Sequence, residues 1–253
     1  MAKRLASVGA GFRAELLVLP IASVENHGVL PLGADYLLAE CVAERIVHML
    51  GEEAAVAPVL AYTTAVEHEV AGPALGASPT TLTGFLLDIA VSAASLAESV
   101  AIVAFHGGAF FPAYVAAREA RRRTGSLVVV ESFWSHVSRV LSERYGIDGY
   151  PIHADPVEAS LLLACGHRVG VREAGLAEVL EEARKRAERL RRLPSPWLGS
   201  DDPDALYPSE PVPANRVFGE ELLEEAVRGL AERLEELLSR TLGGSATRSS
   251  LEK

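Results

Sequence analysis

Short apolar segments alternate with longer amphipathic ones along the first 146 residues, and this alternation constrains the fold more than any other feature. Four segments are short, apolar and bounded by loop residues, which predicts buried strands at 14–22, 54–62, 99–105 and 126–132. The intervening and following segments predict helices at 34–51, 81–98, 112–123 and 133–146. Strands that alternate with helices favour parallel pairing in a sheet covered on both faces. We therefore expect an α/β fold, a three-layer α/β/α sandwich with a largely parallel or mixed central sheet.

The second part of the chain is predicted to be mainly helical. Three further helices are expected: one that continues from Glu158 through "ASLLLAC", one over 172–193 and one over 219–240. The alternating charges of 172–193 are typical of a solvated helix face. Segment 194–215 contains six prolines, so we expect an extended loop that covers a site or a neighbouring subunit. We expect one domain over residues 1–241 and a flexible tail over 242–253.

Charge and composition exclude several classes of protein. The chain has a formal net charge of −10 and a pI of about 5.3, which argues against nucleic acid as a partner. Residues 1–20 lack the continuous apolar region of a signal peptide, and no apolar run approaches a membrane span. Cys41 and Cys165 lie in apolar helical segments, which favours buried free thiols over a zinc site or a disulfide framework. We therefore expect a reducing compartment, a cytoplasmic protein and no membrane partner.

Histidines and carboxylates gather at the predicted ends of strands. The motif "VENHG" follows the first strand, "AFHGG" ends the third, and "IHADPVEAS" precedes a helix. In open α/β sheets, ligands bind beyond the carboxyl ends of the strands. Imidazoles and carboxylates are ligands that Zn²⁺, Mn²⁺ or Fe²⁺ accept. The candidate site residues are Glu25, His27, Asp35, His106, His153 and Glu158.

Each motif also has an interpretation without chemistry. A Glu-x-His pair and an "HGG" turn are both common, and "HADPVEAS" also reads as a helix start capped by Asp155 or Asp148. His68 either lines a pocket or faces solvent beside Glu67 and Glu69. Trp197, in the proline-rich segment, is a candidate for a lid over the site. The combination of motifs, rather than any one of them, favours a metal site.

Taken together and in order, the motifs resemble those of the creatininase family of metal-dependent amidohydrolases. Members carry a Ser-x-Glu-Gln-His-Gly-Pro-His-Leu-Pro-Leu-x-x-Asp signature, an Asn-Gly-His-Gly-Gly-Asn turn and a His-Ala-Gly-x-x-Glu-Thr-Ser stretch. Here these read "SVENHGVLPLGAD", "AFHGGAF" and "HADPVEAS". Two further segments match the family less specifically: "TTAVEHEVAGP" resembles its Glu-His…Pro-Gly segment, and "ANRVFGEELLEEAV", near the C-terminus, resembles its closing helix. The resemblance spans roughly residues 15–240 and implies a creatininase-like fold.

The resemblance implies a metal site and an activity. Glu25, His27, Asp35 and His106 would be metal ligands, with Asp35 shared between two ions. His153 would act in proton transfer or polarise the substrate, and Glu158 would orient the site or complete the metal shell. The expected reaction is hydrolysis of a non-peptide C–N bond of a small or cyclic amide by a metal-activated water. The cofactor would be one or two divalent ions, Zn²⁺, Mn²⁺ or Fe²⁺. Family members commonly form hexamers, so we expect a homo-oligomer.

The departures from the family pattern bear on the substrate. The first signature is one residue shorter and lacks its second His. Ala104-Phe105 and Ala109 stand where the second motif has Asn-Gly and Asn, so support of the ligands is expected to be weaker. In creatininase proper, the position of Gly108 is a glutamate that binds the second metal, and Asp155 stands here for a glycine. These changes argue against creatinine as the substrate, while Asp155 offers a further carboxylate.

A non-catalytic alternative follows from the same departures. The chain could have kept the fold and lost turnover, serving as a small-molecule-binding or assembly protein. Retention of all four candidate metal ligands together with His153 and Glu158 favours the enzyme.

Overall fold

The structure is a computed structural model that describes residues 1–69, 71–148, 153–192 and 203–248. Its centre is a five-stranded sheet in which every neighbouring pair of strands is parallel. The order across the sheet is β1 (Lys3–Arg4), β3 (Ala54–Val56), β2 (Ala14–Ile21), β4 (Ala97–Ala104) and β5 (Leu127–Ser132). The long strands β2 and β4 lie at the middle, and their carboxyl ends pair as Ile21 with Ala104. This common end is where the candidate site forms.

Both faces of the sheet are buried, as parallel pairing requires. Along β2, Leu16 and Val18 belong to one apolar core, whereas Leu17, Leu19 and Ile21 belong to a second core. The split follows from the two-residue period of a strand, in which successive side chains point to opposite faces. An uninterrupted apolar strand therefore supplies both cores at once.

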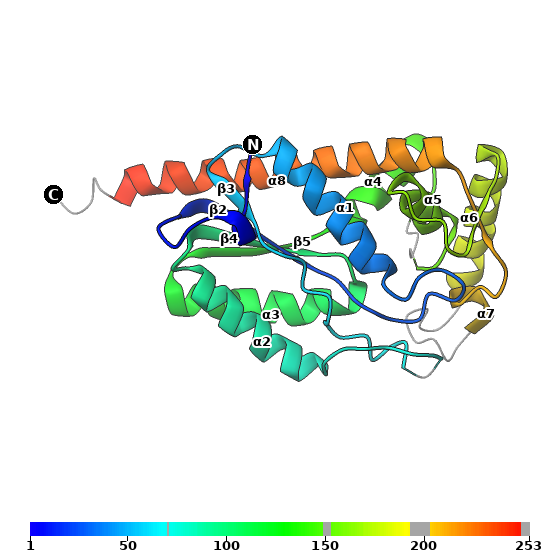
Figure 1. The fold of residues 1–253 in the computed structure, drawn as a ribbon, viewed down its shortest axis with the longest axis horizontal. Coiled ribbons are helices and arrows are strands. Elements are labelled where there is room, and N and C mark those ends of the chain that lie inside the picture. The colour runs from blue at the N-terminus through cyan, green and yellow to red at the C-terminus, as the bar shows by residue number, and fades with distance from the viewer. Residues whose placement is uncertain (70, 149–152, 193–202, 249–253) are drawn as a thin grey trace.

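Helices cover the two faces of the sheet and make the three layers that the sequence predicts (Figure 1). One face carries α2 (Pro79–Ala93) and α3 (Gly107–Thr124). The other face carries α1 (Ala34–Met49), α4 (Phe133–Tyr145), α5 (Pro156–Ala164) and α8 (Arg216–Arg248). The helices α6 (Leu176–Leu190) and α7 (Pro203–Leu206) lie at the α5 end of the molecule (Figure 1). Across the described ranges, no helix is both apolar and long enough to cross a bilayer.

Several predicted boundaries differ from the structure. β3 ends at Val56 instead of 62, and α3 begins at Gly107, five residues before the predicted start. A small second sheet pairs β6 (Val171–Glu173) with β7 (Val212–Ala214), so the start of the predicted helix 172–193 and part of the predicted loop 194–215 are wrong. Strands of three residues are too short to show a period of two, which is why the sequence did not indicate them.

The last helix is longer than the sequence predicts. α8 continues to Arg248, whereas the pattern indicated an end near residue 240. The flexible tail over 242–253 stays a prediction, because residues 249–253 lie outside the described part of the chain. The proposed lid residue Trp197 also lies outside the described residues.

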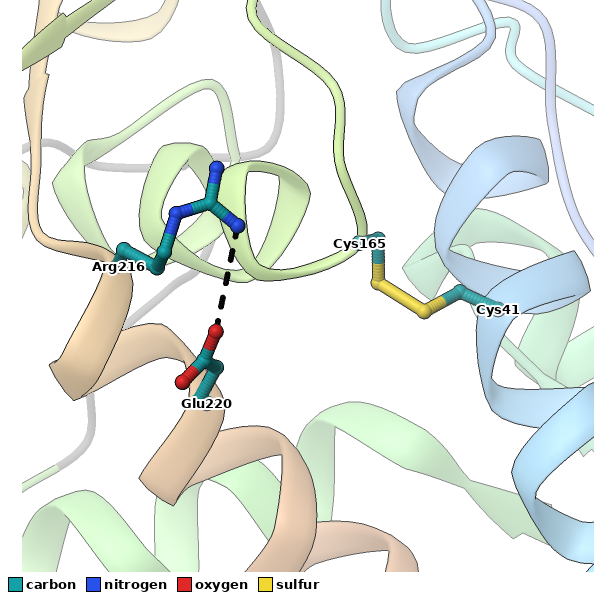
Figure 2. The surroundings of a disulfide bond; sticks show 4 residues. All are labelled: Cys41, Cys165, Arg216 and Glu220. Carbon is teal, nitrogen blue, oxygen red and sulfur yellow. Dashed lines mark ion pairs between the residues drawn. A yellow bond between two sulfur atoms is a disulfide. The ribbon is translucent and has the colours of Figure 1, made fainter.

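The expectation of two free thiols is wrong. Cys41 in α1 and Cys165, directly after α5, form a disulfide with a Cα–Cα distance of 6.1 Å (Figure 2). The pairing was hidden in the sequence because the two cysteines are 124 residues apart and only the packing of α1 beside α5 brings them together. Disulfides are typical of oxidising compartments and of hyperthermophile proteins, so the reason for expecting a reducing compartment no longer holds.

Candidate metal centre

Four of the candidate ligands lie at the carboxyl edge of the sheet, where β2 and β4 end as neighbours. Glu25 and His27 occupy the loop after β2, and Asp35 lies in the first turn of α1, where a carboxylate suits the helix N-terminus. His106 immediately precedes the first residue of α3. The six candidate site residues are each at most 6 % exposed: Glu25, His27, Asp35, His106, His153 and Glu158.

The first ligand set surrounds His106. Its Nδ1 lies 3.0 Å from Oε1 of Glu25 and 3.4 Å from Oδ2 of Asp35. His68 adds a second imidazole, since its Nε2 is 3.4 Å from the same Glu25 oxygen. His68 is 3 % exposed, so the solvent-facing interpretation is wrong; it lies with Glu25 and His106 in one group of possible ligands.

The second ligand set surrounds His27. Its Nε2 lies 3.5 Å from Oε1 of Glu158 and 4.0 Å from Oδ1 of Asp35. Asp35 therefore presents one carboxylate oxygen to each imidazole, and the Ser23 hydroxyl donates a 2.8 Å hydrogen bond to its Oδ2. Two ligands that are about 2.1 Å from one ion lie about 3.4 Å apart in a tetrahedral shell, which is close to these separations.

The chemistry of these side chains fits a divalent metal. Within the described residues, both oxygens of Glu25, Nε2 of His27 and Oε1 of Glu158 are buried without a hydrogen bond of good geometry. Buried polar and charged atoms left without a partner are costly. Carboxylates and imidazoles that converge on one space are the donor set that a Zn²⁺ or Mn²⁺ ion satisfies.

The charges in the metal-free site follow from these contacts. Burial disfavours the charged form of His27, but the nearby carboxylates of Glu158 and Asp35 outweigh burial and raise its pKa to about 10. For His106, burial is likewise outweighed, chiefly by Glu25, and its pKa lies well above the usual value. In the absence of a metal, protons on the two imidazoles compensate the carboxylates.

His153 is a neutral imidazole that faces the same space. Its Nε2 lies 3.0 Å from the backbone oxygen of Asn26, so Nε2 carries the proton and Nδ1 is the acceptor. That Nδ1 is 3.9 Å from Oε1 of Glu25. Burial, together with His27 and His68, holds the pKa of His153 well below its ordinary value. His153 is therefore held in its neutral form, with an unprotonated Nδ1 directed at Glu25.

The turn into α5 places Glu158. Asp155 is the N-cap of α5 and accepts a 2.8 Å hydrogen bond from the backbone N–H of Glu158, so the capping interpretation of Asp155 is correct. The carboxylate of Glu158 reaches back to the N–H of Ala154 at 2.5 Å, which leaves Oε1 directed at His27. Ala154 has a φ of 49°, a left-handed conformation that is uncommon for a residue with a side chain.

Comparison with known proteins identifies the family of this chain. A family model described as creatininase, creatinine amidohydrolase, matches residues 9–234. The chain belongs to the creatininase family. No curated protein matches the sequence.

Solved structures of creatininases share the fold. A tryptophan-to-alanine mutant creatininase is 22 % identical, with a TM-score of 0.67 over 94 % of this chain and 99 % of that chain. A glutamate-to-glutamine mutant, described in one structure with creatine and in another as the Zn-Zn type, is 20 % identical, with TM-scores of 0.66 and 0.64 over the same shares of the chains. A structure described as creatininase Mn is 21 % identical, with a TM-score of 0.61 over 94 % and 99 %.

The residues that depart from the second creatininase motif pack in the apolar cores. Ala104, Phe105 and Ala109, which replace Asn-Gly and Asn, are each at most 1 % exposed and belong to the two cores. The indole N–H of Trp134 donates to the backbone oxygen of Phe105. The turn around His106 therefore has no asparagine side chains at these positions and is stabilised by apolar packing and by the hydrogen bond from the Trp134 indole.

Two side chains at the site were not indicated by sequence motifs. Tyr207, directly after α7, has its hydroxyl 2.8 Å from Nδ1 of His68, and its ring packs edge-on against His153. Burial, Glu25 and Glu67 raise the pKa of Tyr207 to about 12, so the phenol stays protonated at neutral pH. Arg186, from the helix predicted to be a solvated face, donates to the backbone oxygens of His153 and Leu206. A long-range contact of this kind leaves no local signal in the sequence.

Proposed function

We propose that this creatininase-family chain is a metal-dependent amidohydrolase that cleaves a non-peptide C–N bond of a small or cyclic amide. The observation that carries the proposal is the position of Asp35, whose two oxygens face His27 on one side and His106 on the other. Glu25, His27, Asp35 and His106 would hold one or two divalent ions, Zn²⁺, Mn²⁺ or Fe²⁺. Glu158, 3.5 Å from His27, would complete the shell on its side.

Side chains around the metal site have separate roles in the proposed reaction. A divalent metal bound here lowers the pKa of a water towards neutrality and polarises a carbonyl as a Lewis acid. Neutral His153, with its unprotonated Nδ1 facing the centre, would act in proton transfer or in polarising the substrate. The hydroxyl of Tyr207 fixes the orientation of His68. Because the enclosing side chains are buried, the amide reacts away from bulk water.

Creatinine is a poor candidate for the substrate. Ala104 and Ala109 replace the asparagines of the second family motif and are buried in the apolar core. This chain therefore lacks the two side-chain amide groups that would be available to a substrate or a ligand. Other cyclic amides and formamides remain the chemical class to screen.

The test begins with metal content. The protein is stripped with a chelator, reloaded with Zn²⁺, Mn²⁺ or Fe²⁺, and the ions per chain are measured by elemental analysis before a screen of cyclic amides and formamides. We expect one or two ions per chain and, for Asp35→Ala, loss of both metal and hydrolysis. Asp88→Ala, at an exposed position of α2, is the control and should keep both. A wild-type protein that takes up no metal would contradict the proposal.

A non-catalytic protein is the second candidate, favoured by the apolar residues at 104, 105 and 109. Such a protein would bind a small molecule or serve in assembly, and Asp35→Ala would then leave ligand binding unchanged. We also propose a homo-oligomer, with a hexamer as the expected size, to be checked by light scattering coupled to gel filtration. Metal-dependent turnover of any amide by the wild type decides in favour of the enzyme.

A further inference from the structure

His106 has a carboxylate beside each of its ring nitrogens. Nδ1 faces Glu25 at 3.0 Å and Asp35 at 3.4 Å, both of which are candidate metal ligands. Nε2 lies 3.0 Å from Oε1 of Glu67, which is outside that ligand set. Nδ1 of His106 therefore faces carboxylates that are candidate metal ligands, whereas Nε2 faces a carboxylate that is not.

Glu67 reaches His106 from a different part of the chain. It lies in the turn between β3 and α2, and its side chain is 15 % exposed. Nε2 of His106 is buried and, among the described residues, has no hydrogen bond of good geometry in the metal-free arrangement. The Glu67 carboxylate is thus a charged acceptor next to a buried donor that needs one.

The Glu67 carboxylate occupies the space that a side chain at Gly108 would need. A Cβ added at Gly108 would lie 1.9 Å from Oε1 of Glu67 and 2.6 Å from Nε2 of His106. Both separations are shorter than non-bonded atoms adopt, so a side chain at 108 would require Glu67 and His106 to move. The Glu67 carboxylate can therefore occupy its position beside His106 because residue 108 has no side chain.

A carboxylate is a stronger acceptor for an imidazole N–H than a neutral group is, and the Glu67 carboxylate lies within hydrogen-bond distance of Nε2 of His106.

We propose that Glu67 is a positioning residue that accepts a hydrogen bond from the Nε2–H of His106 and so leaves Nδ1 free to bind the metal. A carboxylate behind a ligating imidazole fixes the tautomer and ring orientation and makes the ligand more basic. In this chain Glu67 supplies support that the replaced asparagines no longer give. The inference rests on the metal site of the proposed function, and it adds a residue to which no role had been given.

The test measures Zn²⁺ affinity of the stripped protein by competition with a chromophoric chelator. Relative to the wild type, Glu67→Ala should weaken binding by about 10–100-fold, the usual effect of losing such a partner. Glu67→Gln should fall between the two, because its amide oxygen still accepts the hydrogen bond but carries no charge. Glu69→Ala, at an exposed position in the same turn, is the matched control and should bind as the wild type does.

Stoichiometry and NMR separate positioning from direct ligation. All Glu67 variants should bind the same number of ions per chain as the wild type. In the zinc-loaded protein, the Nε2 proton of His106 should exchange slowly in the wild type and in Glu67→Gln, and rapidly in Glu67→Ala. Unchanged affinity in Glu67→Ala would overturn the inference, and so would loss of one ion per chain, which would make Glu67 a ligand.

The outcome for the inference is distinguishable from that for the proposed function. A wild-type protein without metal uptake overturns both. A wild-type protein that binds metal, combined with a Glu67→Ala variant of equal affinity, overturns only the role of Glu67. Circular dichroism of each variant establishes that it is folded before its affinity is compared.

Discussion

Cys41 in α1 is bonded to Cys165 at the end of α5, and these two helices carry Asp35 and Glu158 in their first turns. The disulfide therefore joins the two helices that supply carboxylates to the same ring nitrogen of His27, Nε2. The first turn of α8, with its Arg216–Glu220 ion pair, lies near the bond (Figure 2). Constraint of these helices supports both the fold and the site.

Reduction of the disulfide should lower the stability of the protein. The bond closes a loop between residues 124 apart in sequence, so its removal frees much of the unfolded chain. We expect the free energy of unfolding to fall by about 2–5 kcal/mol, measured by urea unfolding with and without a phosphine reductant. Cys41→Ser should show the lower stability and no response to the reductant. A wild-type protein whose unfolding ignores the reductant would count against the bond.

The central strands could be predicted because they are apolar on both faces. In β2, the run from Leu16 to Ile21 feeds two cores, and such a run is visible without knowing its neighbours. β3 was predicted too long because "AAVAPVLAY" stays apolar after the continuous pairing ends at Val56, beyond which only an isolated bridge joins Leu60 to Ile21. β6 and β7 could not be predicted, since three-residue strands are defined by their partner rather than by their own pattern.

The candidate site was only partly visible in the sequence. Glu25 and His27 stand two residues apart after a strand, so their chemistry and position could be inferred together. The contact between His68 and Tyr207 spans 139 residues and depends on where α7 packs. Neither the Cys41–Cys165 bond nor that contact has a local sequence signal, because both arise from tertiary packing.

Removal of the Tyr207 hydroxyl should destabilise the site without unfolding the protein. The hydroxyl is 2.8 Å from Nδ1 of the buried His68, and loss of one partner leaves that nitrogen unsatisfied. Tyr207→Phe should lower the free energy of unfolding by about 1 kcal/mol, measured by urea unfolding. Tyr62→Phe, at a position that is 66 % exposed, is the control and should leave the unfolding free energy unchanged. Equal stability of both variants would show that the hydroxyl contributes nothing.

The stability of the metal-free protein should fall as pH rises above neutrality. The carboxylates of Glu158 and Asp35 raise the pKa of His27 to about 10, above its unfolded value near 6.5. A raised pKa means that the folded state holds the proton more tightly, so this stabilisation is complete below pH 6.5 and is lost as pH approaches 10. The free energy of unfolding, measured in the presence of a chelator between pH 6.5 and about 10, should show this decline.

Metal binding should reverse that pH dependence. A ligating imidazole must be neutral, so uptake of an ion near pH 7 releases the His27 proton. Calorimetry in buffers of different ionisation enthalpy should detect this release, and Zn²⁺ affinity should rise with pH. His48→Gln, an exposed position, should release as many protons as the wild type, whereas His27→Gln should release fewer. Proton release that is the same in all three proteins would contradict the assignment of His27.

A methyl group at position 108 should damage the site far more than one at position 107. A Cβ at Gly108 would meet the Glu67 carboxylate and the His106 ring, whereas a Cβ at Gly107 would have nothing within 4 Å. Gly108→Ala should therefore weaken Zn²⁺ binding by at least about 10-fold, because His106 loses its orientation. Gly107→Ala should keep the wild-type affinity and, as the better helix former at the start of α3, unfold no more easily.

The double variant tests whether Glu67 and Gly108 act together. Once Glu67→Ala has removed the carboxylate, the added methyl at 108 has one obstacle fewer, so its further effect on Zn²⁺ affinity should be smaller than in the wild-type background. Residues in contact show such non-additivity, whereas independent sites do not. The measurement is the zinc dissociation constant of the two single variants and the double variant. Additive losses would mean that the methyl acts on His106 alone and that the space at Gly108 is not shared with Glu67.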